Sequence, residues 1–284
     1  MKFRKLMKTV LLALLALVAS ADDTFGILFE ETPALAKIFR ERRVAGTFVM
    51  VDAKADTAFV WNQERAERRY CPGETFRIAN AILALETGVV QDIDAIAPFN
   101  AKTYRSFDEG AHRYFYGPLL NRSGESNRPR NLREKMRVPG TRTFRWLARG
   151  IGIERMRDGL AKLNYGNMLV GNSVDRFWKN GSLQISALEQ VEFLGRVARA
   201  KIPVSQEILN KVRQLTLLEK TKHYELHSKS GWLITPKPEL GWWVGWVERE
   251  NDIFPFALNM DMEKGHPEDR VTIGRECLKA LGKL

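Results

Sequence analysis

Residues 72–86 read PGETFRIANAILALE, and this stretch decides how the rest of the chain is interpreted. It opens with the two turn residues Pro72 and Gly73, and from Ile78 onward apolar residues recur at the three-to-four spacing of a buried helix face. The stretch therefore predicts the start of a helix. Glu74 and Arg77 are one turn apart, so both side chains are expected to point the same way from its first turn.

The N-terminus has the pattern of a secretory signal. A basic start is followed by an almost wholly apolar run over residues 10–18, and Ala19-Ser20-Ala21 has the small-x-small form of a cleavage site. The apolar run is too short for a membrane span, and no later stretch is long enough to be one. We therefore expect residues 1–21 to be removed and the mature protein, which begins near Asp22, to be exported to the periplasm.

The net charge and the two cysteines bear on which ligands and which covalent links to expect. The chain has 45 Lys and Arg against 34 Asp and Glu, and removal of the four basic residues of the leader leaves a net charge of +7. Without an aromatic-basic motif, this charge indicates a soluble surface, and nucleic-acid binding is not expected. Cys71 and Cys277 lie far apart, and both are expected to be unpaired, although an exported protein would allow a disulfide.

Strand patterns occur at both ends of the chain and helical patterns in the middle. Residues 46–52 and 57–62 are rich in β-branched and aromatic side chains, and three further strands are predicted within 224–260. Helices are predicted between them, including 186–198 with Ser186 as the N-cap, and a last helix over 271–281. The pattern predicts an α/β protein of the α+β type: an antiparallel sheet from both chain ends, flanked by helices, with an inserted all-helical lobe.

A long irregular connection is predicted over residues 100–143. It is rich in Arg, Asn, Ser, Gly and Pro, and its most basic part is 121–137. This part could form a basic rim that attracts anionic ligands, but its composition favours a solvated loop.

Three separated segments then need one explanation: the helix start at Glu74, the loop Tyr165-Gly166-Asn167, and the strand segment Lys229-Ser230-Gly231. In that order and at those separations, they resemble the class D (oxacillinase) serine β-lactamases, which share the fold of penicillin-binding transpeptidases. The segments 175–186 and 241–248 continue the resemblance, which covers nearly all of residues 22–284. One domain of that fold is therefore expected after the signal peptide.

The resemblance implies a role for each matching position. The nucleophilic serine of the family falls at Glu74, its N-carboxylated lysine base at Arg77, and the serine of its second motif at Pro139. The matching substrate-binding positions are Lys229, Ser230, Gly231 and Arg270, and the residues that shape the site are Tyr165, Asn167 and Trp178. In place of the leucine that follows the tryptophan in the family, this chain has Lys179.

The replacements at Glu74 and Arg77 remove the chemistry that the family uses. Attack on a lactam carbonyl needs an activated nucleophile, and hydrolysis then needs a base for water. A guanidinium stays protonated and offers no free amine for carbon dioxide, and no Ser-x-x-Lys occurs in the chain. We expect Glu74 and Arg77 to form an ion pair that suits the positive end of the helix dipole and plugs the pocket.

Three functions remain open at this stage. The first is a β-lactamase homologue with impaired catalysis. The second is a binding or sensor module that holds a β-lactam or peptidoglycan fragment without a covalent bond. The third is residual hydrolysis by an atypical mechanism with Glu74 as general base.

No cofactor or metal is expected. Only His223 and His227 among the four histidines lie close in sequence, and in a strand a separation of four residues does not bring two side chains together. The oligomeric state is not indicated by the sequence.

Overall fold

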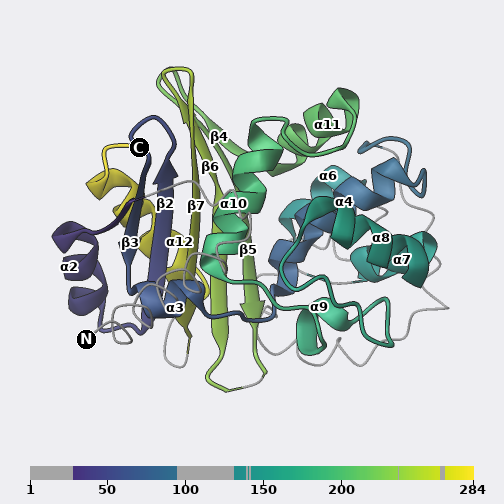
Figure 1. Cartoon of the computed structure of the whole chain (residues 1–284), viewed down its shortest axis with the longest axis horizontal. Helices are drawn as coiled ribbons and strands as arrows, with labels where there is room; N and C mark the ends of the chain where they lie inside the picture. Colours follow the sequence, from purple (N-terminus) through teal and green to yellow (C-terminus); the bar gives the residue numbers. More distant parts are fainter. Residues whose placement is uncertain (1–27, 95–130, 139, 141, 236, 263–265) are drawn as a thin grey trace, which may run out of the picture.

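A seven-stranded sheet forms the middle of the molecule (Figure 1). The computed structural model describes residues 28–94, 131–138, 140, 142–235, 237–262 and 266–284. The strands lie in the order β1-β3-β2-β7-β6-β5-β4, and each pair is antiparallel except β1 with β3. They are β1 (Leu28–Glu31), β2 (Gly46–Asp52), β3 (Thr57–Trp61), β4 (Leu217–Lys220), β5 (Glu225–Leu233), β6 (Leu240–Arg249) and β7 (Asp252–Asp261). The predicted sheet built from both chain ends is confirmed.

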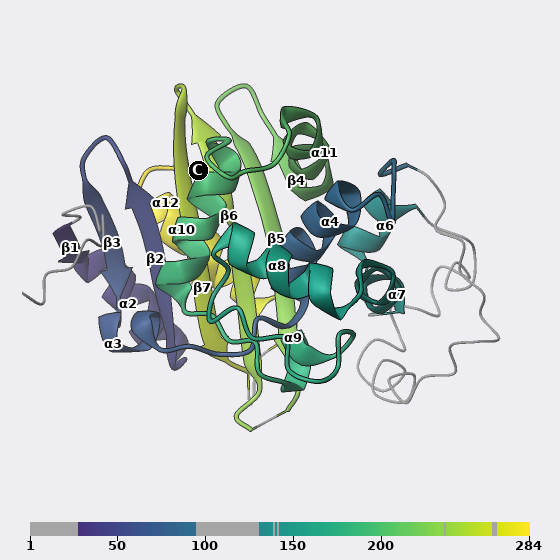
Figure 2. The same cartoon turned by 45° about the vertical axis from the view of Figure 1, so that its right-hand side comes forward.

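Helices cover both faces of the sheet and form a group beside it (Figure 1). The helical elements are α2 (Pro33–Arg42), α3 (Gln63–Glu67), the 3₁₀ turn η1 (Gly73–Phe76), α4 (Arg77–Glu86), α6 (Leu132–Arg137), α7 (Arg142–Ile151), α8 (Ile153–Leu163), α9 (Phe177–Asn180), α10 (Ala187–Ala198), α11 (Gln206–Thr216) and α12 (Asp269–Ala280). Figure 2 shows α10 in front of the sheet, with α4, α6, α7 and α8 grouped to one side. This group is the expected inserted helical lobe.

Two apolar clusters hold these layers together. One joins α4, α7, α8 and α10 to one face of the sheet and includes the buried Trp242 and Trp246; the other joins α2 and α12 to the opposite face around Trp243. The strand pattern explains the division, because alternate residues of β6 point to opposite faces. Helix α4 is central to the first cluster, since every residue from Arg77 to Leu85 is buried.

Several local predictions are confirmed. Ser186 caps α10 in a reciprocal capping box with Glu189. Both cysteines are free, and Cys277 is buried.

Within the described residues, no helix has both the length and the apolar character needed to cross a membrane.

Other predictions need correction. The irregular connection expected over 100–143 contains a helix, α6, in which Asn131 accepts a hydrogen bond from the main chain of Glu134 as N-cap. Strands β1 and β4 were not predicted, because four residues are too few for a clear alternation. The signal sequence and residues 121–130 of the basic stretch lie outside the described residues.

Candidate functional site

The helix start at Glu74 is a 3₁₀ turn that leads into α4. Gly73 has φ +55°, a left-handed conformation that glycine adopts without strain. The Thr75 hydroxyl donates to the carbonyl oxygen of Pro72 over 2.7 Å, which closes the turn. The predicted helix start is therefore present, although its first turn is tighter than an α-helix.

Strand β5 passes directly beside this turn. A Cβ atom at Gly231 would lie 3.3 Å from the main-chain nitrogen of Glu74 and 3.4 Å from that of Thr75. A side chain at this position would be in tight contact with the turn, so glycine leaves the two backbones the most room to approach. The structure thus brings Lys229, Ser230 and Gly231 next to Glu74, as the resemblance implied.

The Glu74 carboxylate binds the main chain of β5. Its Oε2 accepts a hydrogen bond from the main-chain N–H of Trp232 over 3.0 Å. Burial, the largest single influence, raises the pKa of the Glu74 carboxyl, and the positive charges of Arg77 and Lys179 are the main effects that oppose it. The Trp232 hydrogen bond and the nearby Lys229 act in the same direction, so the pKa lies below its usual range and the carboxylate is ionised at neutral pH.

Arg77 is almost fully buried, with 2% of its surface exposed. Its Nη1 donates to the carbonyl oxygens of Lys135 and Val138 over 3.0 and 2.9 Å, and its Nη2 donates to that of Gly140 over 2.5 Å. The guanidinium also lies 4.8 Å from the ring centroid of Phe144. Its described hydrogen bonds therefore tie α4 to residues 135–140, and it acts on Glu74 through its charge.

Two more basic side chains belong to the site: Lys229 in the middle of β5 and Arg270 in the first turn of α12. Burial lowers the pKa of the Lys229 ammonium to about 7, and the positive charges of Arg77 and Arg270 contribute to the same shift. Its Nζ donates to the carbonyl oxygen of Ser230 over 2.6 Å. Arg270, at the beginning of α12, lies 5.9 Å from the ring centroid of Trp232. Arg270, which the resemblance assigns to substrate binding, therefore lies beside the ring of Trp232 in β5.

Aromatic side chains pack against the 3₁₀ turn η1. The ring of Phe76 packs against Tyr165 and Trp178, with centroids 5.7 and 5.2 Å away. Gln190 donates to the hydroxyl oxygens of both Thr75 and Tyr165 over 2.9 and 3.4 Å. Burial raises the pKa of the Tyr165 hydroxyl well above its usual range, so this group stays neutral and serves as a structural support.

Asn167 has a different role from Tyr165. Its amide donates to the carbonyl oxygen of Ser182 over 2.7 Å, and its Oδ1 accepts from the main chain of Gln184 over 3.0 Å. These bonds hold the loop after α8 against residues 182–184 and contact no other residue of the site. Pro139 lies outside the described residues, although its neighbours Val138 and Gly140 both bind Arg77.

Sequence reasoning missed Trp232 as a binding residue. Its contribution is a main-chain N–H, which every residue except proline carries, so no residue type signals it. Elsewhere, Glu225, His227 and Glu248 form the only group of three metal-ligand side chains within the part of the chain that the structure describes. The site around Glu74 is a group of basic side chains about one carboxylate whose pKa they lower.

Comparisons with known proteins identify the family to which this chain and its fold belong. The family model described as the penicillin-binding protein transpeptidase domain matches residues 46–279. β-Lactamase OXA-10 of Pseudomonas aeruginosa is 32% identical over 260 residues, which cover 90% of this chain and 91% of that protein. β-Lactamase OXA-48 of Klebsiella pneumoniae is 31% identical over 258 residues, with coverage of 90% and 91%.

Solved structures of class D β-lactamases have the same fold as this chain. The class D β-lactamase FUS-1 (OXA-85) of Fusobacterium nucleatum subsp. polymorphum superposes with a TM-score of 0.79 at 33% identity, covering 90% of this chain and 100% of that one. A class D β-lactamase of Bacillus subtilis gives a TM-score of 0.74 at 30% identity, with coverage of 88% and 96%. The chain belongs to the class D β-lactamase family, within the larger group of penicillin-binding transpeptidase domains.

Proposed function

We propose that this protein is an exported, periplasmic member of the class D β-lactamase family that has lost acylating catalysis. The observation that carries the proposal is the placement of Glu74, whose carboxylate stands at the helix start and binds the main-chain N–H of Trp232. The residue one turn later, Arg77, is committed to three main-chain carbonyls. Neither the nucleophile nor the base that acyl transfer needs is supplied by these two residues.

The contact with Trp232 adds a second obstacle to catalysis. Acyl transfer depends on preorganised N–H donors that stabilise the oxyanion of the tetrahedral intermediate. A main-chain N–H beside the helix start is a donor of this kind, and here an ionised side chain already occupies it. Glu74 would also repel the carboxylate that a β-lactam carries. Both effects support impaired catalysis.

A paired hydrolysis assay tests the proposal. We expect the natural protein to show no steady hydrolysis of a chromogenic cephalosporin and no stable adduct by intact-mass spectrometry after incubation with penicillin. The double variant Glu74→Ser with Arg77→Lys restores a hydroxyl and an amine, and acquired hydrolysis would support descent from an active enzyme. Continued inactivity of that variant would implicate residues 139 and 179 as well.

Measurable turnover by the natural protein would overturn the proposal. In that event, Glu74→Gln decides the mechanism. If Glu74 is a general base for direct attack by water, the substitution abolishes turnover, because an amide cannot accept the proton.

Noncovalent binding of an anionic ligand is the second candidate function. It is favoured by the positive charges of Arg77, Lys179 and Lys229, which all lower the pKa of Glu74 and therefore lie near its carboxylate. A ligand with a carboxylate, such as a β-lactam or a peptidoglycan fragment, would be attracted by the same charges. Saturable thermal stabilisation by penicillins, cephalosporins or muropeptides would support this candidate, and the absence of any shift would remove it.

A further inference from the structure

The methionines of this protein differ sharply in their exposure to solvent. Of the eight in the sequence, Met1 and Met7 belong to the predicted signal sequence and lie outside the described residues. Met168 is 39% exposed, whereas each of the other five described methionines is at most 2% exposed. Those five are Met50, Met136, Met156, Met260 and Met262. Met168 is therefore the one described methionine that solvent reaches freely.

Met168 lies in a turn that its neighbours hold in place. Its φ is +58°, a left-handed conformation that residues with a side chain rarely adopt unless the surrounding structure enforces it. Its main-chain N–H donates to the carbonyl oxygen of Tyr165 over 3.1 Å. The side chain of Asn167 binds the main chain of residues 182–184, and its Oδ1 also accepts from the N–H of Leu169 over 3.3 Å. The exposure of Met168 is thus a property of a well-braced turn.

Met168 and Leu169 together form an exposed apolar tip on this turn. Leu169 is 55% exposed, so two adjacent apolar side chains face solvent here. Oxidation of a methionine to its sulfoxide replaces a flexible apolar side chain by a polar one. A single oxygen atom added to Met168 would therefore make part of the tip polar.

The two thiols are poorer targets for an oxidant than this thioether. Peroxide reacts with the thiolate form of cysteine, and burial raises the pKa of both Cys71 and Cys277. Both groups are therefore protonated at neutral pH. Cys277 is also fully buried, which adds a steric barrier.

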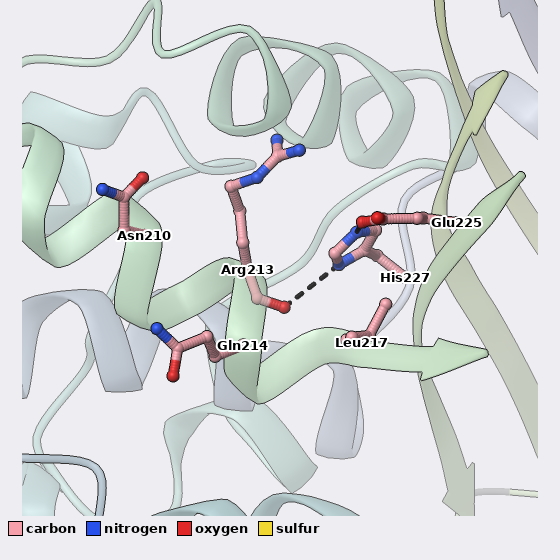
Figure 3. Close-up of a pocket in the computed structure, with 6 residues that line it drawn as sticks. All are labelled: Asn210, Arg213, Gln214, Leu217, Glu225 and His227. Carbon is pink, nitrogen blue, oxygen red and sulfur yellow. Dashed lines mark hydrogen bonds and ion pairs between the residues drawn. The ribbon is translucent and has the colours of Figure 1, made fainter. Parts of the chain in front are cut away.

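A cavity of about 220 Å³ between α11 and β5 admits small molecules but leads to no methionine (Figure 3). The residues that line it are Asn210, Arg213, Gln214, Leu217, Glu225 and His227. A small oxidant that enters there meets no thioether. The five buried methionines consequently react only when the fold opens locally or globally.

We propose that Met168 is a selective and reversible oxidation site for hydrogen peroxide, whose conversion to the sulfoxide makes the exposed apolar tip polar. A lone pair of the thioether sulfur attacks one oxygen of the peroxide, the O–O bond breaks, and an S–O bond forms. The sulfur gives up two electrons, and the other peroxide oxygen leaves as water after it takes the proton of the transferred oxygen. The two methionine sulfoxide reductases, one for each epimer, reverse the change.

Limited oxidation of the full chain tests the site. The natural protein is treated with a small excess of hydrogen peroxide and quenched with catalase, and oxygen uptake is followed by intact-mass spectrometry and peptide mapping. Within residues 28–284, we expect fast uptake of one oxygen atom at Met168, at least about tenfold faster than at any other methionine. In urea, where the fold is lost, these methionines should react at similar rates.

Two variants separate the site from a general effect of the oxidant. Met168→Leu keeps the size and apolar character of an exposed residue and should lose the fast uptake. Met262→Leu makes the same exchange at a buried position and, as the matched control, should keep it. The oxidised natural protein should elute earlier from a hydrophobic-interaction column, whereas peroxide-treated Met168→Leu should not shift. Treatment with both reductases should restore the original elution.

Several results would contradict this assignment. Fast uptake that remains in Met168→Leu would overturn the proposal. So would oxidation of Cys71 or of a buried methionine at the rate of Met168, because exposure would then not select the target. An oxidised protein that elutes unchanged would also overturn it, since the tip would then not contribute to the apolar surface. If Met262→Leu does not fold, the peptide map of the natural protein decides alone.

Discussion

Arg77→Lys is the substitution that most directly tests how the helix start is held. The planar guanidinium uses two nitrogens to reach three carbonyl oxygens at 2.5–3.0 Å, whereas lysine has a single nitrogen. The positive charge near Glu74 is kept, so the change isolates the hydrogen bonds. The lysine ammonium also has three donors, but they radiate from one point, so we expect it to lose at least one of the three bonds that the planar fork of arginine makes.

The expected cost follows from the burial of Arg77. A hydrogen bond to a charged group contributes about 1.5–3 kcal/mol, and with 2% of the side chain exposed little of this is offset by water. Loss of one bond predicts a fall in the free energy of unfolding of about 1.5–3 kcal/mol. For a domain of this size that corresponds to a fall in Tm of about 3–12 °C.

Thermal and urea unfolding measure this change. The matched control is Arg68→Lys, because Arg68 is 59% exposed and its ion pair among the described residues is with Glu64, one turn away on α3. It should alter stability by less than about 0.5 kcal/mol. If Arg77→Lys unfolds like this control, the bonds to residues 135–140 do not hold α4, and the reasoning is refuted.

Three further predictions follow from the site and its supports. Burial lowers the pKa of Lys229 to about 7 from the usual 10.5, so between these pH values the unfolded chain binds more protons than the folded chain. The free energy of unfolding, measured with urea, should therefore rise with pH from about 7 to 10.5. The variant Lys229→Met should not show this rise. The pKa of Glu74 is lowered in the folded chain, so its carboxylate stabilises the fold at pH values above the pKa of an unfolded glutamate. This contribution is lost as the pH falls through the folded pKa. The free energy of unfolding of Glu74→Gln should therefore fall less on acidification than that of the natural protein. Gly166→Ala would place a Cβ 2.3 Å from the carbonyl oxygen of Gln184 at φ +54°, and should lower Tm more than Gly88→Ala, where φ is +71° and the space is open. Equal shifts in Tm for the two glycines would contradict the crowding at Gly166.

Local patterns predicted most of the fold. The apolar spacing after Phe76 marked α4, and Ser186 followed by Glu189 marked the beginning of α10. These features depend on residues within one or two turns of each other, so the sequence contains them fully. Short edge strands carry too few residues for such a pattern, which is why β1 and β4 were not predicted.

Contacts between residues far apart in the sequence could not be predicted as fully as the helices and strands. The bond between Glu74 and Trp232 joins residues 158 positions apart, and it depends on how closely β5 passes the turn. The grouping of Glu225, His227 and Glu248 depends on the register of β5 with β6, which composition does not set.

The charges around Glu74 fit a fold that persists without acyl transfer, as the proposed function requires. The basic side chains of Arg77, Lys229 and Arg270 repel one another, and such repulsion favours unfolding or loss of a proton. Burial is the main cause of the lowered pKa of Lys229, and the charges of Arg77 and Arg270 lower it further. The negative charge of Glu74 offsets part of this repulsion, and its carboxylate also satisfies the main-chain N–H of Trp232. Under the proposed function, this carboxylate would therefore stabilise the fold at the same position where it removes the nucleophile.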